Sequence, residues 1–322
     1  MSQVAITSKE LEKNMVKILR STKWKEVKKY KVLYLLLMPA ILFTIIFSYI
    51  PMGGLVVAFQ KYNMWKGIAG SEFVGLANFK EIFQVPMFVN ATVRTLWYGV
   101  AFLVVGFPAP IILALMFNEI RQVAFKKVAQ TLSYLPYFLS WASAIGIIYA
   151  FLATDGLYND IMSAISGGGY IRANPLMVVN KFLPILLWSG LWKGVGWGTV
   201  VYLAAITSID PALYESAAMD GCSKFKQIIY ITLPGILTTV MILLIFSMGS
   251  LLNTSFEQVY GLQNIFVQDG TDVISTIVYR SGIMQGHYSL ATAFGLAQGL
   301  VSVILVVGVN KITTKLSNIG IF

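Results

Sequence analysis

Residues 32–59 read VLYLLLMPAILFTIIFSYIPMGGLVVAF, a run of 28 residues without one charged side chain. A helix needs about 20 apolar residues to cross the hydrocarbon core of a bilayer, so this run is long enough to span one. The 31 residues before it are polar and rich in lysine, and the run is too long for the apolar part of a secretory signal peptide. The run therefore predicts a transmembrane helix near the N-terminus.

The rest of the chain has the same character. Of its 322 residues, 57% are apolar and 12% are charged, whereas soluble domains carry about 25% charged residues. This composition excludes an ordinary soluble domain and predicts an all-α membrane protein with six transmembrane helices. The predicted spans cover residues 32–59, 90–117, 132–153, 182–206, 228–252 and 290–309.

The basic residues predict which way the chain crosses the membrane. With six spans, sixteen Lys and Arg residues fall on the side of the two termini and six on the opposite side. Cytoplasmic loops carry the excess of Lys and Arg, so both termini are expected in the cytoplasm of a plasma-membrane protein. The net charge of +10 comes from lysines that flank spans, which favours contact with lipid headgroups over nucleic acid.

Several kinds of chemistry are not expected. The chain has one cysteine, Cys222, and one histidine, His287, which excludes an internal disulfide and a Cys/His metal cluster. It has no G-x-x-x-x-G-K-[ST] phosphate loop, and its spans contain no Asp, Glu or His that an embedded enzyme would need. The glycine-rich GVGWG at 194–198 lies inside a span, where close helix packing explains it. We therefore expect no catalytic residues and no bound cofactor or metal.

Three regions divide the chain. Residues 1–31 form a cytoplasmic tail in which Thr7 and Glu10 match a capping box, followed by apolar residues at helical spacing. This pattern predicts an amphipathic helix on the inner leaflet, and a disordered basic tail is the alternative. Residues 32–309 form the membrane domain and residues 310–322 a cytoplasmic C-terminal tail. The apolar positions of the N-terminal helix are Leu11, Met15, Ile18 and Leu19.

The loop at 207–234 carries the most information about mechanism. Residues 208–236 read SIDPALYESAAMDGCSKFKQIIYITLPGI. Asp210 is suited to cap a helix that begins at Pro211, and Gly221 is suited to end it in the left-handed conformation. Pro234 then kinks the entry into the fifth span. The pattern predicts a helix–turn–helix elbow at the membrane face, and an ordinary amphipathic connector is the alternative.

The residue types in this loop match a known sequence pattern. YESAAMDGCSKFKQIIYITLP closely resembles the EAA loop in permease subunits of binding-protein-dependent ABC importers. Ser216 and Cys222 depart from the usual alanines of that pattern, but both are small. The matching positions are Glu215, Ala217, Ala218, Asp220, Gly221, Ile231, Leu233 and Pro234.

The resemblance extends along nearly the whole chain, through SYIPMGGLVVAFQKYN, VGLANFKEIF, NATVRTL and DVISTIVYRSGI. It is to permeases of the carbohydrate-uptake class, and within it to the branch that imports oligosaccharides and polysaccharide fragments. It implies the type I ABC importer fold, in which the elbow is a coupling helix that docks into a groove of a cytoplasmic ATPase. Glu215 would pair with a basic residue of that groove, and Gly221 would make the turn.

The resemblance also implies partners. These are a second permease subunit, usually a different one, two ATPase subunits that bind ATP and Mg, and an extracytoplasmic solute-binding protein. Two rival functions remain open: an ABC permease for a non-sugar solute, and a stand-alone secondary transporter that needs no ATPase.

Sugars bind to aromatic ring faces and hydrogen-bonding groups, so residues of these kinds within the spans or next to them are candidates for the substrate path. Trp188 and Trp192 share a face of the fourth span, and Lys193 lies near its middle, where a lysine costs a few kcal/mol and usually faces a cavity or a partner. A lysine paired within the bundle, aromatic packing and a solvated loop are the structural alternatives. The remaining candidates are Tyr98, Trp141, Asn253 and Glu257.

Overall fold

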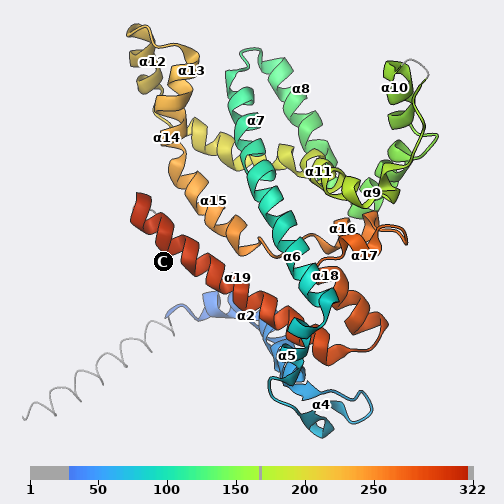
Figure 1. Ribbon diagram of the computed structural model, residues 1–322. Helices are drawn as coiled ribbons and strands as arrows, with labels where there is room; N and C mark the ends of the chain where they lie inside the picture. Colours follow the sequence, from blue (N-terminus) through green and yellow to red (C-terminus); the bar gives the residue numbers. More distant parts are fainter. Residues whose placement is uncertain (1–28, 167–168, 318–322) are drawn as a thin grey trace, which may run out of the picture. The chain divides into compact units, whose positions relative to one another are not determined.

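The computed structural model describes residues 29–166 and 169–317, and its helices are shown in Figure 1. The helix predicted over residues 7–19 lies outside the described residues. The chain divides into two compact units, Met1–Val56 and Val57–Phe322.

The described part of the first unit is helical throughout. It continues into the second unit as one helix, Lys31–Phe59, of 29 residues, so the helix predicted over 32–59 is confirmed. Its segments are α2 (Lys31–Thr44), the π-helical η1 (Ile45–Tyr49), α3 (Ile50–Met52) and the 3₁₀-helical η2 (Gly53–Phe59).

Prolines set the local shape of three helices. The π-helical segments η1, η3 (Phe102–Gly106) and η6 (Ile228–Thr232) each end two residues before a proline. A proline has no N–H to donate to the carbonyl four residues earlier, and its ring collides with that carbonyl. A wider π turn makes room for the ring, because its hydrogen bonds reach five residues back. The prolines concerned are Pro51, Pro108 and Pro234.

After η2, the second unit contains a small hairpin and two short helices. Two strands pair antiparallel, with Gln60 opposite Phe73, and the buried Asn78 side chain donates to the carbonyl oxygens of Ala58 at 2.8 Å and Gln60 at 3.0 Å. This small hairpin departs from the all-α expectation. The elements are β1 (Gln60–Lys61), α4 (Gly67–Gly70), β2 (Glu72–Phe73) and α5 (Ala77–Gln84).

The predicted second span is one helical run in the structure, whereas the third is interrupted. The second is one helical run, Pro86–Glu119, built from α6 (Pro86–Ala101), η3 and α7 (Pro108–Glu119). The third, predicted over 132–153, is not one continuous helix. It is interrupted at Pro136 and restarts where the Ser140 hydroxyl caps the Ser143 N–H. The elements are α8 (Val123–Tyr134), η4 (Leu135–Phe138), α9 (Trp141–Leu152) and α10 (Leu157–Ser166).

The next segment holds the predicted fourth span and the elbow. Helix α11 (Val179–Thr207) contains residues 182–206, and a bend of 62° separates the two halves of the predicted fifth span. The following elements are α12 (Pro211–Met219), α13 (Lys224–Gln227), η6, α14 (Leu233–Gly235) and α15 (Leu237–Gly249); the short η5 (Pro175–Met177) precedes α11.

Short helices lead to a long last one. The TDVISTIVYRSGIM segment forms α18 followed by a π-helical turn, and the final helix continues past residue 309, where the sixth span was predicted to end. The elements are α16 (Phe256–Leu262), α17 (Gln268–Thr271), α18 (Ile274–Ile277), η7 (Val278–Met284) and α19 (Tyr288–Ser317).

Four described helical runs are long and apolar enough to cross a membrane, or five if the bent pair counts as one span. The helix α11 is long enough at 29 residues but is not among them, because its tryptophans, glycines and Lys193 lower its mean hydropathy. The runs are Lys31–Phe59, Pro86–Glu119, Trp141–Ser166 and Tyr288–Lys315, with Lys224–Gly235 and Leu237–Gly249 as the bent pair.

Within the second unit, the loops between spans gather at different ends. The turn between α7 and α8 and the elbow of α12 and α13 both lie at the top of Figure 1, while α4 and α5 lie at the bottom.

Candidate functional site

The elbow begins as the sequence predicts. The Asp210 carboxylate accepts a hydrogen bond from the Ala212 N–H at 2.9 Å, and Pro211 is the first residue of α12. The cap satisfies one N–H that the helix leaves unpaired, and proline at this position loses no helical bond. The start of the elbow is therefore fixed by three neighbouring residues.

The turn of the elbow depends on Gly221. Its φ is 74°, and the N–H groups of Gly221 and Cys222 donate to the carbonyls of Ala218 at 3.1 Å and Ala217 at 2.9 Å. This is the Schellman arrangement, in which a left-handed residue closes a helix by pairing its last carbonyls. The predicted helix end at Gly221 is confirmed.

Side chains join the two arms of the elbow. The Tyr214 hydroxyl of α12 lies 2.9 Å from the Thr232 hydroxyl of η6, and the Gln227 amide donates to the Cys222 carbonyl at 3.3 Å. Both Gln227 and Thr232 are buried. The elbow thus has an interior of its own, which makes it suited to move as one body.

The outer surface of the elbow is charged and apolar. Glu215 and Asp220 are exposed, and so are two large side chains, Met219 at 89% and Phe225 at 72%. Sequence reasoning did not select Met219 and Phe225, although both lie in the quoted loop. Of the other coupling positions, Ala217 is half-buried and Ala218, Leu233 and Pro234 are exposed.

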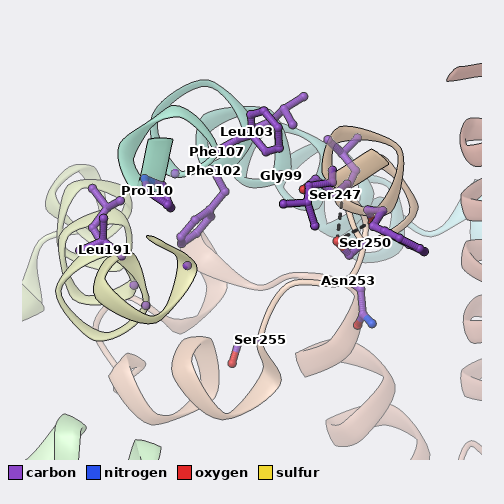
Figure 2. A pocket seen from close by; sticks show the side chains of 18 of the residues that line it. Gly99, Phe102, Leu103, Phe107, Pro110, Leu191, Ser247, Ser250, Asn253 and Ser255 are labelled. Atoms are coloured by element: carbon purple, nitrogen blue, oxygen red, sulfur yellow. Dashed lines mark hydrogen bonds between the residues drawn. The ribbon is translucent and has the colours of Figure 1, made fainter. Parts of the chain in front are cut away.

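A cavity of about 610 Å³ lies between the η3 region, α11, α15 and the segment that follows α15 (Figure 2). This volume is in the range of ligand pockets, which are mostly apolar with a few polar groups. Its apolar wall includes Phe102, Leu103, Phe107, Pro110 and Leu191.

Polar side chains collect along the stretch from the end of α15 to the start of α16. Asn253 and the Thr254 hydroxyl line the cavity, and that hydroxyl is buried without a hydrogen-bond partner in the described chain. Gln258 ties this stretch to α11 by donating to the Leu186 carbonyl at 2.7 Å and the Ser189 hydroxyl at 2.9 Å. The other polar lining residues are Ser247, Ser250 and Ser255, labelled in Figure 2.

We call the polar side chains of residues 247–258 that line the cavity the collar. The sequence offered a signal for it, because residues 247–256, SMGSLLNTSF, are rich in hydroxyl and amide groups next to an apolar span. Only Asn253 was selected from it. Individual serines in a membrane helix commonly donate to the preceding turn, as Ser247 does to the Leu243 carbonyl at 2.8 Å, so their types alone do not mark a cavity.

Glycines allow the cavity walls to approach one another. A methyl group on Gly99 would lie 2.1 Å from the Leu251 carbonyl oxygen, and one on Gly198 would lie 2.9 Å from the Pro110 ring. Within the GVGWG motif, Gly196 also packs against backbone, while Gly194 has open space around it. Close helix packing therefore explains Gly196 and Gly198, as expected from the sequence, but not Gly194.

The seven residues predicted for the substrate path lie in four places. Asn253 lines the cavity and the other six do not. Tyr98 is buried and stacks near Phe182, with ring centroids 6.3 Å apart, and Glu257 is exposed on α16.

The other four lie along α9 and α11. Trp188 stacks between Phe151 and Trp192, with ring centroids 5.9 Å and 6.3 Å away. The Lys193 ammonium donates to the Tyr137 carbonyl at 2.8 Å and lies 5.4 Å from the centroid of the Trp141 ring.

A buried ion pair was not predicted at all. Arg280 pairs with Asp272 and donates to the Gln263 side chain at 2.7 Å, and both charged side chains are largely buried. Asp272 also accepts from the Thr276 hydroxyl at 3.0 Å, so the pair has the extra hydrogen bonds that buried charges need. Among the described residues no group of three His, Cys, Asp or Glu side chains is arranged to hold a metal.

The chain is similar to a known protein family. Residues 106–313 match the family described as binding-protein-dependent transport system inner membrane component. Among curated proteins, Protein LplB of Bacillus subtilis (strain 168) is 40% identical over 297 residues, 92% of each chain. The polygalacturonan/rhamnogalacturonan transport system permease protein YteP of the same organism is 39% identical over 293 residues, 91% of this chain and 90% of its own.

Solved structures of one bacterial transporter are also similar. The crystal structure of a bacterial ABC transporter involved in the import of the acidic polysaccharide alginate contains a chain with 37% identity and a TM-score of 0.84. In the complex of the bacterial alginate ABC transporter with an alginate pentasaccharide-bound periplasmic protein, the TM-score is 0.85 at the same identity. Each comparison covers 92% of this chain and 99% of the other.

Proposed function

Because this chain belongs to the family of binding-protein-dependent transport system inner membrane components, we propose that it is the permease subunit of an ATP-driven importer of oligosaccharides or polysaccharide fragments. The chain performs no chemistry of its own. It forms part of the path through the membrane and switches between states open to the two sides.

The observation that carries the proposal is similarity over almost the full length. Two relatives with carbohydrate substrates in their names or titles, the YteP permease and the alginate transporter, are 39% and 37% identical and cover over 90% of this chain. The sn-glycerol-3-phosphate permease UgpA of Pectobacterium atrosepticum is 26% identical over 87% of this chain. The higher identity favours a carbohydrate over a small phosphate ester.

We propose six membrane crossings with both termini in the cytoplasm. The apolar runs and the bent pair account for five, and α11 supplies the sixth, because 29 helical residues extend about 43 Å at 1.5 Å per residue. The lower apolarity of α11 fits a helix that borders a polar path, since polar residues in spans usually face the bundle interior or a water-filled cavity.

The elbow is proposed to couple transport to a separate ATPase. Met219 and Phe225 expose large apolar side chains on the elbow, and such side chains are suited to contact a protein partner. Glu215, exposed on the same elbow, is available to pair with a basic residue in the groove of that partner. The contact between Tyr214 and Thr232 would transmit a displacement of α12 to η6, and from there to α15, while the shape of the elbow is kept.

The cavity is proposed as part of the substrate path. Its hydroxyl and amide collar can exchange hydrogen bonds with sugar hydroxyls, and its aromatic wall offers ring faces to sugar C–H groups. A second permease subunit would complete the path. A solute-binding protein would deliver the sugar from outside, in line with the complex described for the alginate transporter.

The direct test is reconstitution of the chain with its second permease, ATPase and binding protein in liposomes, followed by uptake of labelled oligosaccharide with and without ATP. Wild-type complex is expected to accumulate sugar only with ATP. Gly221→Pro, or removal of residues 213–221, is expected to abolish uptake while the protein still inserts, because the elbow loses its turn. Uptake at the wild-type rate in Gly221→Pro would refute the coupling role.

The single cysteine allows a check on orientation. Cys222 is half-buried beside Gly221, and it is the one thiol in the sequence. A membrane-impermeant maleimide is expected to label it in inside-out vesicles and not in intact cells, and assembly with the ATPase is expected to slow the labelling. Labelling from the external medium would contradict the proposed topology.

A further inference from the structure

Lys193 carries a charge in the middle of α11 that no acidic residue neutralises within the described chain. The ion pairs there join Arg172 to Asp160 and Arg280 to Asp272. A lysine near the centre of a membrane helix costs a few kcal/mol, so its position calls for a physical reason.

Part of the reason is local. The third predicted span is interrupted between Tyr134 and Trp141, and the interruption frees backbone carbonyls that a continuous helix would pair. Lys193 donates to one of them, the Tyr137 carbonyl, at 2.8 Å. An ammonium group has three N–H donors, so this bond leaves two that no described residue accepts.

Aromatic rings surround the ammonium group. Its nitrogen lies 5.3 Å from the centroid of the Tyr137 ring and 5.4 Å from that of Trp141. The Tyr137 ring stacks on Trp197 with centroids 4.8 Å apart and an angle of 8° between the ring planes. The Phe138 ring lies edge-on against both, with centroids 5.8 Å and 5.9 Å away, yet Tyr137 and Trp197 remain 42% and 44% exposed, so part of each side chain is accessible within this chain.

One member of this group, Trp197, lines the cavity. Gly190, Gly194 and Trp197 line the cavity from positions three before, one after and four after Lys193. On a helix the first and last of these share the face of Lys193, so the lysine stands directly beside the cavity lining. Neither glycine has a side chain that would separate the ammonium group from the cavity.

We propose that Lys193, with the rings of Tyr137, Trp141 and Trp197, is an anionic-sugar subsite that recognises the carboxylate of a uronic acid residue during transport. The two free donors match the two oxygens of a carboxylate, and the stacked rings provide a surface for the C–H face of the same sugar. Aromatic contacts keep the ammonium group in place when no substrate is present. This inference rests on the proposed function and narrows it to acidic oligosaccharides.

The test compares charged and neutral forms of the same sugars. Uptake is measured in the reconstituted complex for a panel of oligogalacturonides and alginate oligosaccharides and for their carboxyl methyl esters. The variants are Lys193→Met, which removes the charge, Lys193→Arg, which keeps it, and Lys181→Met as a matched control. Lys181 lies on the same helix and is exposed near its N-terminal end.

Lys193→Met is expected to lower the preference for acid over ester by about tenfold or more, the usual effect of losing a hydrogen bond between charged groups. Lys193→Arg is expected to restore most of the preference, and Lys181→Met to leave it unchanged. The ratio of acid to ester is measured within each variant, so it does not depend on how much protein folds or on the binding protein, which is the same throughout.

Two results would overturn the inference alone. One is an equal loss of acid and ester uptake in Lys193→Met, which would mean that the lysine only supports the interruption before α9. The other is a wild-type complex that transports the esters and not the acids. Absence of ATP-driven uptake of every member of the panel by wild-type complex would also overturn the inference, whereas the proposed function falls only if neutral oligosaccharides are not taken up either.

Discussion

Gly196→Ala is the sharpest test of how α11 packs against α8. A methyl group on Gly196 would lie 2.0 Å from the Ser133 carbonyl oxygen and 2.4 Å from its carbon. Real contacts of this kind are not shorter than 3.0 Å, so the two helices must separate by about 1 Å at this point. No rotamer change relieves the contact, because both atoms belong to the backbone of α8.

The matched control is Gly194→Ala on the same helix. Nothing lies within 4 Å of a methyl group added there. Both substitutions gain the same helix propensity, about 1 kcal/mol over glycine, so the difference between them isolates the collision. Overpacking typically costs 1–3 kcal/mol, and a backbone collision belongs at or above the upper end, so we expect Gly196→Ala to be less stable than Gly194→Ala by about 3 kcal/mol.

The assay is thermal unfolding of the purified protein in detergent, followed by far-UV circular dichroism. Gly196→Ala is expected to melt clearly below wild type, and Gly194→Ala at or slightly above it. A separation of 1 Å is also enough to stretch the 2.8 Å bond from Lys193 to Tyr137 beyond hydrogen-bonding distance, since Tyr137 follows Ser133 by one helical turn. Equal melting temperatures for the two variants would refute this account of the α8–α11 contact.

Three further predictions concern the elbow and the buried ion pair. Tyr214→Phe and Thr232→Val each remove one hydroxyl of the 2.9 Å contact, so each should lower the stability of the elbow by about 1 kcal/mol and raise the number of ATP hydrolysed per sugar transported. The double variant should be little worse than either single variant, and additive effects would contradict a direct contact. Arg280→Met should lower the free energy of unfolding by about 3–5 kcal/mol, measured by thermal unfolding, because it leaves the buried Asp272 carboxylate without its partner. Adding Asp272→Asn should recover much of this loss, and no recovery would mean that the broken ion pair is not its cause. Gly221→Asn should keep most of the uptake because asparagine tolerates the left-handed conformation, whereas Gly221→Val should destabilise the turn by about 1–2 kcal/mol and lower uptake. Equal uptake by the two variants would argue against a left-handed turn at this position.

The elbow was predictable from sequence because its determinants are local. Asp210, Pro211 and Gly221 act on backbone groups no more than five residues away, so their order along the chain contains the geometry. What the sequence did not reveal is the link between Tyr214 and Thr232, since a contact across 18 residues depends on how the second arm folds back.

The interruption in the third span shows the limit of reading apolar runs. Residues 132–153 are apolar enough for one helix, yet Pro136 and the Ser140 cap divide it. Both signals were present in the sequence. Hydropathy reports whether a segment prefers lipid and not whether its helix is continuous.

The membrane class, the apolar spans, the family likeness and the elbow can all be inferred from the amino-acid sequence, because they depend on composition or on neighbouring residues. Which polar residues meet depends instead on how the helices pack. Gln258 reaches the Leu186 carbonyl across 72 residues, and Lys193 reaches the Tyr137 carbonyl across 56. Such pairs form when packed helices bring distant segments together, and the glycines at 99, 196 and 198 set how closely those helices approach. The cavity and the surroundings of Lys193 follow from that packing, which no short stretch of the chain specifies.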